Sequence, residues 1–123
     1  MSTIESPGVI DWLAVSDDGS EVVLVVSDHL SWVDEAGHIV KLQEKLNVYL
    51  ACIESGEAIE LADAQLPGKR QPSARVRVEI VARHSLSAGG DAFLRYATKA
   101  FEAIGASLTH RVLLVLPSRG GRG

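Results

Sequence analysis

Two short apolar runs near the start of the chain predict a pair of adjacent strands. They span residues 9–16 and 21–27 and flank the dipeptide Asp18-Gly19. This dipeptide tolerates the positive φ angles of a tight hairpin turn. The second run contains five consecutive apolar residues and has no polar face. We therefore expect the second strand to lie inside the sheet and to be covered on both sides.

Apolar residues at helical spacing predict a helix after the loop that follows this hairpin. They are Ile39, Leu42, Leu46, Tyr49, Leu50 and Ile53. Ser55-Gly56 should end the helix, because glycine adopts the left-handed conformation of a helix C-cap without steric penalty. Residues 57–72 have weak periodicity, and we expect them to form a connector with room for one helical turn.

The second half of the chain predicts a strand, a helix and a last strand. Residues 74–84 alternate between apolar and charged side chains, which indicates a strand with one wet face. Residues 87–106 carry an apolar stripe with Asp91 in the first turn and Gly105 as the stop, which indicates a second helix. Residues 107–116 predict a fourth strand that ends at Pro117. The glycine- and arginine-rich tail, 117–123, has nothing to bury, and we expect it to be disordered.

These elements predict an α/β (α+β) two-layer sandwich in one domain, residues 1–116. Their order is ββαβαβ, and each helix links a strand to the next one. Such crossovers are right-handed almost without exception, so both helices should pack on one face of a four-stranded mixed sheet.

Composition favours a cytoplasmic globular protein of one domain. The chain has 123 residues, with no apolar run that could span a membrane and no signal-peptide pattern at its start. The lone Cys52 cannot form an intramolecular disulfide. The charge is uneven, since residues 1–63 carry −11 and residues 64–123 carry +7. Either the two halves neutralise each other within the fold, or the molecule presents an acidic and a basic face to a partner.

The segment from residue 27 to 47 holds the strongest candidate for a ligand site. Imidazole and carboxylate groups at this density could hold a metal ion or a small ligand, although the ligand spacing of known metal motifs is missing. The candidate residues are Asp28, His29, Trp32, His38 and Asn47. In a purely structural alternative, Asp34 caps the helix, Trp32 packs across the end of the sheet, and the histidines are hydrogen-bond partners.

The motifs of the sequence predict no catalytic residue, metal ligand or cofactor. Neither a nucleophile elbow nor a phosphate-binding glycine loop nor a zinc-protease helix motif is present. The sequence "AGGD" at residues 88–91 could bind an anion at a helix N-terminus, but Asp91 favours simple capping.

Two surfaces are candidates for an interface. The predicted outer face of the first helix, with Lys41, Glu44 and Lys45, also carries the small apolar residues Val48, Ala51 and Cys52, which could pack against another subunit. The sheet face away from the helices should carry Arg77 and Arg111. Nucleic acid is disfavoured as its partner, because the chain is net acidic and lacks the aromatic pairs on which bases stack.

Motifs through most of the chain resemble a small bacterial family that is catalogued only as a domain of unknown function. They are the loop "SDHLSW", the helix "LQEKLNVYLACIESGE", and "PGK" followed by "RVRVEI". This resemblance implies no activity, cofactor or catalytic residue. We therefore expect a non-enzymatic protein that associates with itself as a homodimer or with another protein. A small-ligand or metal site in the loop, with a possible catalytic role, is the alternative, and an immunity-type acidic protein that binds a basic partner is a further one.

Overall fold

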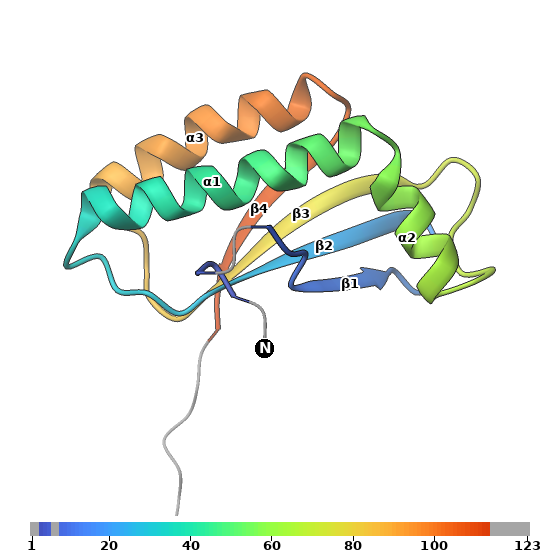
Figure 1. Ribbon diagram of the computed structural model, residues 1–123, viewed down its shortest axis with the longest axis horizontal. Helices are drawn as coiled ribbons and strands as arrows, with labels where there is room; N and C mark the ends of the chain where they lie inside the picture. The colour runs from blue at the N-terminus through green and yellow to red at the C-terminus, as the bar shows by residue number, and fades with distance from the viewer. Residues whose placement is uncertain (1–2, 6–7, 114–123) are drawn as a thin grey trace, which may run out of the picture.

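A four-stranded sheet with helices on one face forms the protein (Figure 1). The structure is a computed structural model that describes residues 3–5 and 8–113. The strands are β1 (Trp12–Val15), β2 (Glu21–Asp28), β3 (Arg75–Ala82) and β4 (Ser107–Val112), and the helices are α1 (Glu35–Glu54), α2 (Glu57–Gln65) and α3 (Ala88–Glu102). The predicted α+β class and the four-stranded mixed sheet are confirmed.

The strands lie in the sheet in their sequence order, β1-β2-β3-β4. β1 pairs antiparallel with β2, whereas β2–β3 and β3–β4 are parallel. The predicted hairpin turn is present, with Gly19 at φ +75°. A Cβ on Gly19 would lie 2.6 Å from the Lys69 carbonyl oxygen, so only glycine fits this turn.

Side chains alternate between a helix-covered face and an open face of the sheet. Val22, Leu24 and Val26 of β2 point to the helices and are fully buried. The core between the two layers also contains Val78, Ile80, Leu42, Leu46, Tyr49, Leu94 and Phe101. The prediction that the second strand is covered on both sides is wrong, because the three helices all lie on one face (Figure 1).

The predicted order and the number of helices need correction. Residues 57–72 were expected to form a connector, but Glu57–Gln65 is helix α2, so the order is ββααβαβ. Gly56, at φ +85°, separates α2 from α1. The fully buried residues of α2 are Ala58 and Ala62, whereas Ile59 and Leu61 are only partly buried against the core. Two alanines give little hydrophobic contrast, which explains why the periodicity of this helix is weak.

The first strand is shorter than the predicted span of 9–16. The backbone groups ahead of Trp12 bond to α1 side chains and not to the β2 backbone: Lys45 Nζ donates to the Val9 carbonyl, and Asp11 N–H donates to the Tyr49 hydroxyl. The predicted end of the fourth strand, 114–116, and the predicted tail, 117–123, lie outside the described residues.

Candidate functional site

Asp28 and His38 form a buried polar pair at the end of β2. Asp28 is the last residue of this strand and His38 lies in the first turns of α1, and both are nearly inaccessible to solvent. His38 Nε2 lies 2.6 Å from Asp28 Oδ2, and Nδ1 lies 3.0 Å from the Ser31 carbonyl oxygen. Asp28 Oδ1 also accepts a hydrogen bond from Leu30 N–H. The pair therefore anchors the loop between β2 and α1 at both of its ends.

Both ring nitrogens of His38 are occupied. A carbonyl oxygen only accepts hydrogen bonds, so Nδ1 carries a proton and donates it to Ser31. The short contact between Nε2 and Asp28 Oδ2 engages the other ring nitrogen. As arranged, neither ring nitrogen of His38 is free to contact a substrate or a metal ion.

Trp32 covers this pair. Its ring stacks on the His38 ring, with centroids 3.7 Å apart and an interplanar angle of 23°. The Trp32 ring also lies close to Gly90 in α3, because a Cβ added to Gly90 would lie 2.7 Å from the ring. Trp32 therefore wedges between α1 and α3, whereas the structural alternative expected it to pack across the end of the sheet.

Capping groups hold the starts of α1 and α3 together. The predicted cap of the first helix is present, since the Asp34 carboxylate accepts a hydrogen bond from Gly37 N–H. At the start of α3, Ser87 accepts from Gly90 N–H, and the Glu35 carboxylate accepts from Gly89 N–H. The "AGGD" segment is thus capped by Ser87 and by an acidic side chain of the neighbouring helix.

His110 on β4 is a neighbour of the pair that sequence reasoning did not select. Its Nε2 is buried and has no hydrogen-bond partner among the described residues. Burial lowers the pKa of His110, while the nearby Asp28 charge raises it and His38 lowers it. Alternation along β4 places His110 on the same face of the sheet as Leu108, and its pairing with Ile80 brings it near the loop.

The structure does not bring the other two predicted ligand residues to this cluster. His29 is exposed, with Nε2 3.3 Å from a Glu5 carboxylate oxygen. It lines, with Asp28, a pocket of about 230 Å³ at the carboxyl ends of β2 and β3. Asn47 is exposed and lines a separate groove of about 160 Å³ between α1 and α3. In the described part of the chain, no three His, Cys, Asp or Glu residues are placed to hold a metal ion.

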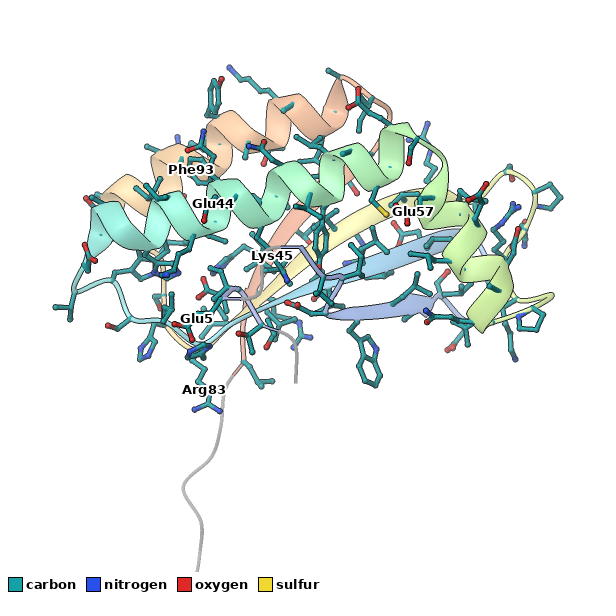
Figure 2. The ribbon with its side chains drawn as sticks, viewed as in Figure 1. Glu5, Glu44, Lys45, Glu57, Arg83 and Phe93 are labelled. Carbon is teal, nitrogen blue, oxygen red and sulfur yellow. The ribbon has the colours of Figure 1, made fainter. Side chains whose placement is uncertain are left out.

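A second buried polar cluster was missed because Lys45 was assigned to the outer face of its helix. Lys45 is fully buried and points from α1 toward the sheet (Figure 2). Its Nζ lies 2.6 Å from Asp11 Oδ1. Asp11 Oδ2 accepts from Ser27 N–H, and Tyr49 donates to the Val25 carbonyl at 2.6 Å. Burial raises the pKa of the Tyr49 hydroxyl above its usual range.

The predicted outer face of the first helix also needs correction at Cys52. Cys52 is buried in the core, and its burial, with the nearby Glu57, raises the pKa of the thiol to about 11. Ala51 is exposed and Val48 is half-buried. Both line an open groove of about 650 Å³ between α1, α2 and residues 8–10.

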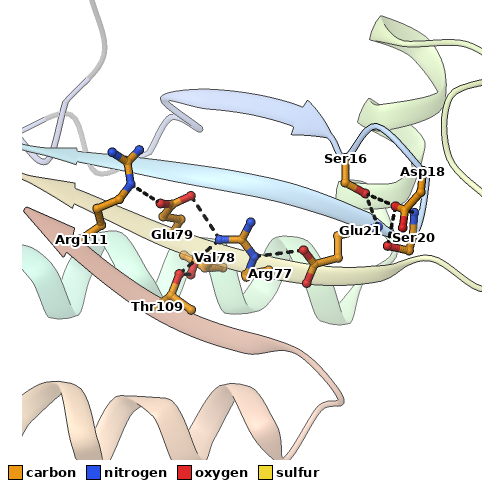
Figure 3. Close-up of polar contacts among 9 residues, drawn as sticks. All are labelled: Ser16, Asp18, Ser20, Glu21, Arg77, Val78, Glu79, Thr109 and Arg111. Carbon is orange, nitrogen blue, oxygen red and sulfur yellow. Dashed lines mark hydrogen bonds and ion pairs between the residues drawn. The ribbon is translucent and has the colours of Figure 1, made fainter. Parts of the chain in front are cut away.

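The open face of the sheet carries the predicted arginines in a row of ion pairs (Figure 3). Arg111 Nε lies 2.7 Å from Glu79 Oε2, and Arg77 contacts both Glu79 at 3.1 Å and Glu21 at 3.2 Å. The hydrogen bond from Arg111, supported by Arg77, lowers the pKa of Glu79 against the opposing effect of burial. Beside this row Trp12 is 68% exposed.

The comparison with protein families agrees with the resemblance that the sequence motifs indicate. A model described as a family of unknown function, DUF6572, matches residues 1–114. The chain belongs to the DUF6572 family. No curated protein and no solved structure matches this DUF6572 protein. Among its described residues, no helix has both the length and the apolar character needed to cross a bilayer.

Proposed function

We propose that this DUF6572 protein is a non-enzymatic association domain that forms a homodimer through the open face of its sheet. The observation that carries the proposal is Trp12. It lies on β1, is 68% exposed, and belongs to a sheet face that none of the described helices covers. Exposed tryptophan is uncommon on monomer surfaces and is enriched at the centres of protein interfaces.

Apolar residues along the open face, from β1 to the opposite edge of the sheet beyond β4, support this surface. Trp12 pairs with Val25 across the β1–β2 ladder, and Ala14 pairs with Val23. Leu113, just after β4, is 45% exposed. Two such faces would pack as a sheet-on-sheet sandwich, with the strands of the two sheets nearly aligned.

The buried polar groups support a non-enzymatic role. Asp28 holds His38, and Asp11 holds Lys45, so each of these charges is committed to a partner inside the molecule. A catalytic acid, base or nucleophile must instead direct an unengaged group at its substrate.

Sedimentation velocity over a range of protein concentrations tests the proposal. The wild-type protein should sediment as a dimer at tens of micromolar, and Trp12→Ser should shift it toward monomer. Tyr96→Ser is the matched control, because Tyr96 is 75% exposed on α3 in the helix layer. A wild-type monomer at every concentration, or equal effects of the two substitutions, would contradict the proposal.

A second candidate function is the binding of a small ligand in the pocket lined by Asp28 and His29. This pocket, of about 230 Å³, lies at the carboxyl ends of parallel strands, where α/β proteins commonly bind ligands. Native mass spectrometry of protein purified without added ligand should then show a reproducible extra mass. His29→Ala should abolish it, whereas His84→Ala, at another exposed histidine, should not.

A further inference from the structure

Charges of alternating sign form a straight row across the open face. From β4 to β2 the row reads Arg111, Glu79, Arg77 and Glu21, and each charge contacts the next (Figure 3). The row is diagonal to the strands, because Arg111 pairs with Val81 and Glu21 pairs with Arg75 in the ladders on either side of β3.

A row with four alternating charges is complementary to its own reversed copy. In a face-to-face homodimer the two-fold axis lies in the plane of the interface. An axis perpendicular to the row reverses it, so every positive charge meets a negative one. An axis along the row would place like charges opposite each other, which disfavours that orientation.

We propose that two copies of this chain pack open face to open face with these rows reversed. Arg111 then lies against Glu21 of the partner subunit, and Arg77 lies against Glu79 of the partner subunit. This inference rests on the proposed function and specifies its partner and orientation. Trp12 pairs with Val25, and Val25 pairs with Glu79, so Trp12 lies beside the middle of the row. The proposed orientation therefore explains the position of Trp12. The two copies of Trp12 meet near the axis.

Each charged side chain of the row can contact a residue of the partner subunit and still keep its contact within its own chain. Arg111 and Glu21, the two ends, keep 55% and 38% of their side-chain surface exposed. A guanidinium has five N–H donors, and a carboxylate accepts several hydrogen bonds. In this dimer the aromatic and aliphatic side chains supply most of the affinity, and the charges select the orientation.

Charge reversal at the two ends of the row tests the orientation. Arg111→Glu alone, or Glu21→Arg alone, places like charges opposite each other twice in a homodimer. Each should raise the dimer dissociation constant about tenfold or more. The double variant, and an equimolar mixture of the two single variants, should restore dimers, because both recreate opposite charges across the axis. Arg95→Glu on α3 is the control, since its charge lies outside the face.

Sedimentation velocity and urea unfolding of each variant separate the outcomes. Loss of the dimer in both single variants, with recovery in the double variant, supports the reversed rows. A wild-type dimer that neither substitution weakens overturns this orientation but leaves the proposed function standing. Weakening without recovery in the double variant also overturns it. A wild-type monomer overturns both. The unfolding data show that each variant is folded, so that a misfolded chain is not read as a dissociated one.

Discussion

Lys45 and Asp11 form an ion pair inside the protein, with Nζ 2.6 Å from Oδ1 and both side chains almost completely buried. The pair joins the middle of α1 to the residue just before β1. Asp11 also accepts a hydrogen bond from Ser27 N–H in β2. A lysine on a helix surface thus becomes the link between the helix layer and the edge of the sheet.

Lys45→Met should destabilise the protein by about 3–5 kcal/mol, because it leaves a buried carboxylate without its counter-charge. Urea unfolding followed by circular dichroism measures the loss. The double variant Lys45→Met/Asp11→Asn should be more stable than Lys45→Met, since it removes the uncompensated charge. Lys41→Met changes an exposed lysine of the same helix, and its effect should stay within about 0.5 kcal/mol. Equal effects of Lys45→Met and Lys41→Met would refute a buried pair.

His110 should make stability depend on pH below neutrality. Burial lowers its pKa below the ordinary 6.5, so the unfolded chain takes up this proton before the folded one. Stability therefore falls as the pH drops from 6.5 toward the lower pKa of the folded state, and His110 contributes no slope above that window. His110→Gln should flatten the slope in urea midpoints measured between pH 7.5 and pH 5.5. An NMR titration in which His110 protonates above pH 6.5 would contradict this prediction.

Gly90→Ala should destabilise the protein, although alanine normally favours a helix over glycine. The new Cβ would lie 2.7 Å from the Trp32 ring, which is held in place by its stacking on His38. We expect a loss of about 1–3 kcal/mol, typical of an overpacked contact. Gly89→Ala is the matched control, because its Cβ would meet the Glu35 carboxylate, the end of a flexible side chain. Thermal unfolding should rank Gly90→Ala as the less stable variant, and the opposite rank would argue against the wedge.

Cys52 should react slowly with a thiol reagent in the folded protein. It is 5% exposed, and burial raises its pKa to about 11, so very little thiolate is present at pH 8. Absorbance with a disulfide reagent should show slow modification in buffer and rapid modification in concentrated urea. Rapid reaction in buffer, at the rate seen in urea, would show that Cys52 lies on the outer face of its helix.

Strong local patterns made most of the fold predictable. The hairpin followed from Asp18-Gly19 between two apolar runs, and α1 and α3 followed from their apolar stripes. The mixed sheet followed from the hairpin at its start and from the crossover helices between the later strands. α2 was missed because its buried residues, Ala58 and Ala62, differ little in hydropathy from an ordinary connector.

The candidate site was predicted in part. Asp28, Trp32 and His38 do come together, whereas His29 and Asn47 lie elsewhere. The inner side of α1 has a strict spacing of four and three residues that sequence reasoning could have used. It runs through His38, Leu42, Lys45, Tyr49 and Cys52, all of them buried. Polar residue types hid this pattern, because a lysine is almost never fully buried unless it is paired.

The sequence by itself determined the hairpin turn, α1, β3 and α3, since hydrophobic periodicity and turn residues act over a few positions. It also determined the cap of α1, where Asp34 bonds a residue three positions away. Only the tertiary structure decided that Asp11 meets Lys45, that His110 approaches Asp28, and that the charges of three strands align in one row. Such pairs lie far apart in the chain. Their partners depend on strand order, register and helix docking, which arise from packing of the whole core and not from any local segment.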